Sequence, residues 1–223
     1  MQFTYNQNSK QDILNIDGDN YKYLFKVRRH KLNEVINFRN LIDNNIYEYK
    51  IIEINRREAI LKLINQYEKQ IEPKKFLEIA WCMIDLKSIE KVLPSLNEIG
   101  VSKISFIYCD RSQRNFKLNM DRLKSILINS NQQCGRSSFI EFELFNSLDE
   151  FILKRDNITL LDFCDNLIDS KDNNIDTILI GNEGGFSESE REKMSEFKKV
   201  GFDTNLILRS ESAVVAFASK LLI

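Results

Sequence analysis

Residues 178–187 read Ile-Leu-Ile-Gly-Asn-Glu-Gly-Gly-Phe-Ser, and this stretch indicates the fold of the carboxyl-terminal half. The apolar run 178–180 is typical of a buried strand. The glycines that follow are typical of a tight loop, because glycine adopts positive φ angles freely. Such loops lie at the carboxyl ends of strands in parallel α/β sheets, where ligands bind. We therefore expect a binding site here; the alternative is a tight turn without a ligand.

A helix is expected directly after this loop. Ser187 and Glu190 have the spacing of a capping box. Lys198 and Lys199 lie where the helix dipole favours cations, and Gly201 can end the helix. The loop matches neither G-x-G-x-x-G nor the P-loop pattern, and the carboxylate at position 183 opposes phosphate binding, so a phosphate ligand is disfavoured.

Composition indicates a soluble chain with a substantial core. The 223 residues, 43% of them hydrophobic, allow one large or two small domains. No apolar run is long enough to cross a membrane, and the first residues lack the pattern of a signal peptide, so we expect a cytoplasmic protein. The four cysteines are irregularly spaced, which favours reduced, mostly buried thiols over a metal site or a disulfide framework. They are Cys82, Cys109, Cys134 and Cys164.

Basic residues gather locally although the net charge is only −1. A solvated face explains any one group, but three groups in one chain favour a polyanionic partner. The groups are Lys26, Arg28, Arg29, His30 and Lys31; Arg56 and Arg57; and Arg111, Arg114 and Lys117.

The two parts of the chain differ in their expected secondary structure, and the boundary lies near Pro73. We expect a β-rich domain over residues 1–70 and an α/β domain over 71–223. The first domain should hold a helix at 21–29 and strands at 34–39, 47–55 and 59–64. In the second domain, strands alternate with helices. The expected strands are 76–84, 103–109, 159–164, 177–180 and 205–208, with further apolar segments at 139–145 and 148–153. The expected helices are 86–99, 119–133, one after 187 and one from 210. This alternation predicts a mainly parallel sheet, with a kink or a late start at Pro94.

Three motifs together resemble one family. They are I-G-N-E-G-G-F-S at 180–187, L-R-S-E-S-A at 208–213 and Q-C-G-R at 133–136, with weaker support from E-I-G-V at 98–101. On these motifs the chain resembles the ribosomal RNA small subunit methyltransferase E family of the SPOUT superfamily. That family methylates N3 of a uridine in 16S ribosomal RNA of the small ribosomal subunit.

The resemblance implies an α/β, SPOUT-type, mostly parallel sheet with a carboxyl-terminal trefoil knot, preceded by a small β-rich PUA-like domain. It also implies a homodimer and S-adenosylmethionine as methyl donor, with no metal. Backbone along the two loops would bind the donor: Leu179, Ile180, Gly181, Glu183, Gly184, Gly185, Leu206, Ile207 and Leu208.

Departures from the family pattern occur at three places. Ser95 replaces a lysine, and Thr204, with the two residues after it, replaces a Gly-x-Arg. We expect Asn182, which replaces a proline, to loosen the glycine loop, because asparagine keeps its N–H and a freer φ.

Arg209 is the candidate catalytic residue, because a fixed cation stabilises the imide anion that forms when uridine N3 loses its proton. The alternative is that Arg209 pairs with Glu211 or with a carbonyl. Glu183 is a second candidate, as proton acceptor or as a partner of the donor; the alternative is a role in loop structure. Candidate RNA contacts are Arg28, Arg29, Lys31, Arg56, Arg57 and Arg136, although Arg136 equally suits a helix end.

Two other functions stay open on the sequence. The first is a SPOUT methyltransferase with another RNA target, for example a ribose 2′-oxygen. The second is a non-catalytic RNA-binding assembly protein. The departures from the family pattern at Ser95 and Thr204 favour this alternative. A P-loop or Rossmann enzyme ranks last because its fingerprints are absent.

Overall fold

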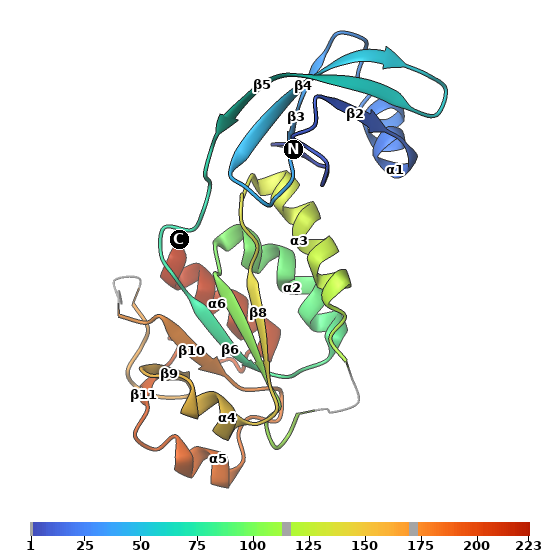
Figure 1. Ribbon diagram of the computed structural model, residues 1–223. Helices are drawn as coiled ribbons and strands as arrows, with labels where there is room; N and C mark the ends of the chain where they lie inside the picture. Colours follow the sequence, from blue (N-terminus) through green and yellow to red (C-terminus); the bar gives the residue numbers. More distant parts are fainter. Residues whose placement is uncertain (1, 113–116, 170–173) are drawn as a thin grey trace. The chain divides into compact units, whose positions relative to one another are not determined.

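The computed structural model describes residues 2–112, 117–169 and 174–223; Arg114 of the third basic group lies outside these ranges. The chain divides into two compact units (Figure 1). The first comprises the residues up to Glu72 together with Ile128–Ser138, and the second comprises Pro73–Leu127 and Phe139–Ile223.

The first unit is built on a five-stranded sheet in the order β1-β3-β4-β5-β2. All neighbours are antiparallel except β1 and β3. The expected helix begins earlier, as α1 (Gly18–Tyr21), and continues into a wider π-helical turn, η1 (Lys22–Val27). Both pack on the sheet through Tyr21 and Leu24. The strands are β1 (Thr4–Tyr5), β2 (Ile13–Ile16), β3 (Val35–Arg39), β4 (Asn45–Ile54) and β5 (Ala59–Glu68).

The second unit contains a six-stranded, entirely parallel sheet in the order β11-β9-β10-β6-β7-β8. The expectation of a mainly parallel sheet is therefore confirmed. The strands are β6 (Glu78–Cys82), β7 (Lys103–Ile107), β8 (Glu141–Phe145), β9 (Ile158–Leu161), β10 (Thr177–Ile180) and β11 (Lys198–Val200).

Helices cover both faces of this sheet, because alternate residues of each buried strand point to opposite sides. Trp81 and Ile180 belong to the core shared with α2 (Leu86–Ile99), α6 (Ser210–Leu222) and the first half of α3 (Met120–Cys134). Ala80 and Leu179 belong to the opposite core, with α4 (Leu148–Leu153) and α5 (Glu188–Lys193). The sheet is thus a middle layer (Figure 1).

The region after α5 differs from the expectation. The helix ends at Lys193, and residues 198–200 form the edge strand β11 instead of a last helical turn. Gly201 follows that strand, where a Cβ would lie 2.7 Å from the carbonyl oxygen of Cys164, so close approach explains the glycine. Residues 205–208 are not a strand; they lie in the loop before α6.

α2 has the expected bounds. It starts at Leu86, capped by the Asp85 carboxylate, which accepts from the Ser88 N–H, so of the two outcomes expected at Pro94 the late start is not found. The expectation for the cysteines is wrong in part. Cys82 and Cys109 are joined by a disulfide instead of being free thiols, while Cys134 and Cys164 are free. In the described part of the chain, no helix is long and apolar enough to cross a membrane.

Candidate functional site

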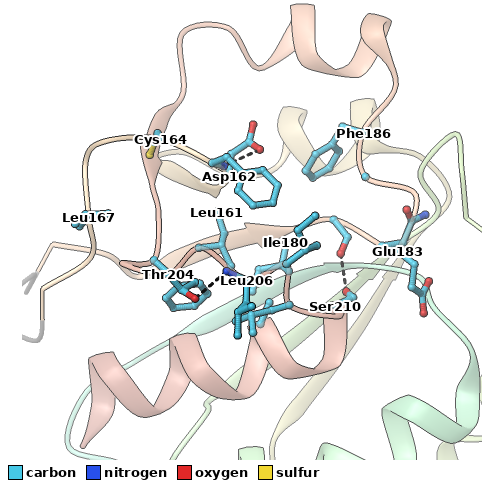
Figure 2. A pocket seen from close by; sticks show the side chains of 18 of the residues that line it. Leu161, Asp162, Cys164, Leu167, Ile180, Glu183, Phe186, Thr204, Leu206 and Ser210 are labelled. Carbon is cyan, nitrogen blue, oxygen red and sulfur yellow. Dashed lines mark hydrogen bonds between the residues drawn. The ribbon is translucent and has the colours of Figure 1, made fainter.

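A cavity of about 760 Å³ lies in the second unit, beyond the carboxyl ends of β9 and β10 (Figure 2). Three loops line it: residues 161–167 after β9, the glycine loop after β10, and residues 202–208 before α6. The chain runs outward from β6 to β7 and β8, then returns to the other side of β6 for β9 and β10. The cavity lies beside this reversal, over the ends of β9 and β10. Ligands bind at the carboxyl ends of parallel strands, and the volume suits a ligand of cofactor size.

The glycine loop is ordered by Asn182, which is only 8% exposed. Its side-chain oxygen accepts from the Gly184 N–H at 3.0 Å, and its backbone carbonyl accepts from the Gly185 N–H at 3.0 Å. Gly185 has a φ of 64°, which favours glycine. Asparagine therefore fixes the loop through its own side chain, and the expected loosening is wrong.

A second segment, residues 109–112 after β7, holds the loop from outside. The Arg111 guanidinium donates to the Gly184 carbonyl at 2.5 Å, and the Asp110 N–H donates to the Glu190 carboxylate at 2.8 Å. The Ser187 hydroxyl bonds to the Asp110 carboxylate at 2.6 Å. Ser187 and Glu190 also form the expected capping box of α5, which is confirmed.

Ser210, the first residue of α6, joins that helix to the loop. Its hydroxyl accepts from the Trp81 indole N–H at 2.8 Å and donates to the Gly181 carbonyl at 2.6 Å (Figure 2). Ser210 is 4% exposed and borders the cavity. The bonds fix the amino end of α6 against β6 and β10.

Most residues expected at the ligand border the cavity, namely Ile180, Gly181, Glu183, Gly185, Leu206, Ile207 and Leu208. Leu179 does not, because it is buried within β10. Gly184 faces Arg111 instead. The exposed Glu183 side chain makes no hydrogen bond or ion pair with any described residue, so no structural role is visible for it.

Arg209 is the exposed N-cap residue of α6, next to a cavity-lining residue on either side. It does not border the cavity itself. Among the described residues no ion pair joins Arg209 to Glu211, so that part of the expected alternative is not found. One carboxylate oxygen of Glu211, Oε2, is shielded from solvent and has no hydrogen-bond partner among those residues.

The basic candidates of the first unit are mostly exposed: Arg28, Arg29, Lys31, Arg56 and Arg57. Arg136 is different, with an exposed fraction of 5% and a hydrogen bond from its Nε to the Ser138 hydroxyl at 3.2 Å. Burial lowers the pKa of the Arg136 guanidinium, the sign of a desolvated cation. This position does not suit an RNA phosphate contact and favours the structural alternative.

Comparison with known proteins agrees with this architecture. The family model of the RNA methyltransferase domain matches residues 70–222, and that of the RNA methyltransferase PUA domain matches residues 16–64. The Ribosomal RNA small subunit methyltransferase E of Helicobacter pylori is 37% identical over 222 residues, which cover 98% of each chain. The chain belongs to the ribosomal RNA small subunit methyltransferase E family.

Solved structures share the fold of this family member. A Legionella pneumophila methyltransferase in complex with SAM matches 98% of this chain and 95% of its own, with a TM-score of 0.79 at 21% identity. A Neisseria gonorrhoeae ribosomal RNA small subunit methyltransferase E bound to S-adenosyl methionine gives 0.75 at 19% identity, over 98% and 96% of the two chains. The α/β unit and the PUA-like unit before it are therefore those of the family.

The sequence did not predict two charged residues that line the cavity opposite the glycine loop, Asp162 and Arg191. Asp162, directly after β9, accepts from Arg191 of α5 at 2.6 Å and from the Phe163 N–H at 3.0 Å. Both charged residues border the cavity. The rule that ligands bind at the carboxyl ends of strands would have found Asp162, since it follows an apolar run. No pattern relates it to Arg191. No cluster that could hold a metal ion occurs in the described ranges.

Proposed function

We propose that the protein transfers a methyl group from S-adenosylmethionine to N3 of a uridine in 16S ribosomal RNA. One observation carries the proposal. The glycine loop that resembles the family motif borders the cavity at the carboxyl ends of β9 and β10, in a chain that matches a ribosomal RNA methyltransferase over 98% of its length. Relatives of that name and the RNA methyltransferase family model support ribosomal RNA as the substrate class.

The residues at the cavity fit a nucleoside methyl donor. Apolar side chains such as Ile180, Leu206 and Ile207 suit a planar base, and the glycine loop gives access to main-chain polar groups. A Cβ on Gly185 would meet no atom closer than 3.9 Å, the Arg191 guanidinium, so the side left open by the glycine is free for a ligand. The donor supplies an electrophilic methyl group when bound.

The acceptor chemistry requires help from the chain. Uridine N3 carries a proton and a delocalised lone pair, so it becomes a good nucleophile only after deprotonation. Arg209 is exposed beside the cavity and has no ion-pair partner among the described residues, so it is available to stabilise the anion. Glu183, which also lacks such a partner and borders the cavity, is the proton acceptor or a partner of the donor.

The first unit positions the RNA. Its exposed cations Arg28, Arg29, Lys31, Arg56 and Arg57 provide phosphate contacts that carry no sequence information themselves. Arg136 is left out of this surface because it is buried.

The proposal includes a homodimer and a carboxyl-terminal trefoil knot. Family membership alone supports the knot. For the dimer there is a second argument, because Phe163, Leu206 and Ile207 border the cavity with exposed fractions of 79%, 73% and 84%. Large apolar side chains gathered in this way mark an interaction site. Light scattering should give twice the 26.3 kDa chain mass.

Methylation of ribosomal particles tests the proposal. Small subunits from a strain lacking the gene are incubated with purified protein and radiolabelled donor, and the RNA is digested to nucleosides. We expect the label in 3-methyluridine. Label in a ribose 2′-O-methyl nucleoside instead would move the chain to another RNA target, and no label with intact RNA binding would favour a non-catalytic assembly protein.

A further inference from the structure

The charges around the cavity are unbalanced. Among the described residues that border it, the ionisable carboxylates are those of Asp162, Asp165, Glu183 and Asp203, while Arg191 is the one guanidinium. The amino end of α6 adds a partial positive charge of about half a unit. Even with the neighbouring Arg209 counted, negative charge remains in excess.

We propose that this acidic lining, centred on Asp162, makes the cavity prefer a cationic sulfonium nucleoside over the neutral thioether of the same shape. The inference rests on the proposed function and extends it to ligand exchange. Methyl transfer moves CH₃ from sulfur to nitrogen, and the electron pair of the broken bond stays on sulfur. S-adenosylmethionine thereby becomes S-adenosylhomocysteine and loses one positive charge. The lining therefore favours replacement of the spent product by fresh donor.

Asp162 carries most of this preference because it is the least exposed of the four carboxylates. Its side chain is 13% exposed, whereas Asp165, Glu183 and Asp203 are exposed and screened by salt. The Phe163 N–H and Arg191 orient the carboxylate, which still has acceptor sites free. Figure 2 shows Asp162 across the cavity from Ile180 and Leu206.

The two ligands form a matched pair of probes. Both carry the same adenosine, ammonium and carboxylate groups, so the ratio of their dissociation constants isolates the effect of the sulfonium charge. Across a cavity of this size, one unit charge acting on another changes this ratio by roughly twofold to thirtyfold, for an effective dielectric constant between about 80 and about 20.

Calorimetry with each ligand tests the proposal. We expect wild-type protein to bind S-adenosylmethionine more tightly than S-adenosylhomocysteine. Asp162→Asn should reduce the preference by about threefold or more, and Arg191→Met should increase it, because this change leaves the carboxylate uncompensated. A purely structural role of the ion pair predicts a different result, since loss of either partner would then weaken both ligands equally.

Two substitutions on α5 serve as controls. Glu192→Gln removes an exposed carboxylate, and Lys193→Met removes a cation that pairs with Asp149; neither residue borders the cavity. Neither should change the ratio, and added salt should lower the wild-type ratio. Two results would overturn this inference without affecting the proposed function. One is equal binding of the two ligands by the wild-type protein. The other is a change of the dissociation-constant ratio in the same direction in the Asp162 and Arg191 variants. Failure of the wild-type protein to bind either ligand would also overturn the proposed function.

Discussion

The side chain of Arg111 fills the space beside the Cα of Gly184 while its guanidinium donates to the Gly184 carbonyl at 2.5 Å. A Cβ built on Gly184 would lie 3.2 Å and 3.3 Å from two carbons of this side chain. One arginine therefore both holds the loop and leaves a larger residue at position 184 too little room unless the Arg111 side chain moves. The glycine is favoured here by a neighbour and not by backbone conformation, since Gly184 has no positive φ.

This relationship predicts a coupling between two substitutions. Gly184→Ala should weaken donor binding in the wild-type background, because the new methyl group displaces Arg111. In an Arg111→Ala background the same change should cost much less, giving a coupling of about 1 kcal/mol. A double-mutant cycle on the dissociation constant of the donor measures this term. Additive effects would show that the contact does not shape the loop.

Gly185 differs from its neighbour and allows a second prediction. Its φ of 64° makes any other residue strained, yet a Cβ would find open space. Gly18 in the first unit has a φ of 56° and no atom within 4 Å of a Cβ, so it is a matched control. We expect Gly185→Ala and Gly18→Ala each to lower stability by about 1 kcal/mol. Only the former should also weaken donor binding in calorimetry, because its methyl group occupies space for the ligand.

Local signals in the sequence were sufficient for much of the fold. The bounds of α2 and the capping box of α5 were predictable because helix period and cap chemistry depend on residues within a few positions. The residues 205–208 were misread because apolar side chains there look like a strand, whereas they are exposed at the cavity. Residues 198–200 form a strand only because β9 offers a free edge, which is tertiary information.

In the candidate site, too, some features were predictable from local sequence and others depended on tertiary packing. The glycine loop was predictable because backbone requirements leave a mark in one short stretch. The pairing of Asp162 with Arg191, 29 positions apart, depends on how α5 packs over the end of β9. The role of Asn182 also needed the structure, because an asparagine side chain either loosens a loop or caps it, depending on which N–H groups it reaches.

Glu143 makes stability depend on pH at the opposite end of the sheet. Burial alone would raise the pKa of its carboxyl group, but hydrogen bonds from Lys103 and Arg155 lower the pKa below its ordinary value of 4.5. A carboxylate with a lowered pKa stabilises the fold above the unfolded pKa, and this contribution is lost as the pH falls through the folded pKa. We therefore expect the free energy of unfolding to fall below about pH 4.5, and less steeply in Glu143→Gln.

Urea unfolding between pH 7 and pH 3 measures this difference. The control is Glu141→Gln, because Glu141 lies exposed on the same strand. It should keep the wild-type pH dependence. Identical slopes for wild type and Glu143→Gln would show that the ion pairs of Glu143 do not contribute.

Arg28 and Arg29 should contribute to RNA affinity through charge alone. Each lost phosphate contact flattens the slope of log affinity against log salt concentration by roughly 0.7 to 0.9. We expect the double change Arg28→Ala with Arg29→Ala to flatten the slope for 16S ribosomal RNA fragments accordingly, measured by filter binding. Lys220→Ala, an exposed cation at the end of α6, is a control for general charge loss. An unchanged slope would remove Arg28 and Arg29 from the RNA surface.

Arg209 allows the sharpest separation of chemistry from binding. If its guanidinium stabilises the uridine anion, the interaction exists only when charge develops, so Arg209→Ala should slow single-turnover methyl transfer by about 100-fold. The affinity for the donor should not weaken, because Arg209 does not border the cavity. Arg209→Lys should recover part of the rate, since it keeps the charge but loses the planar fork. Weaker donor binding with an unchanged transfer rate would instead assign Arg209 to the structure of the cavity and leave the anion to another group.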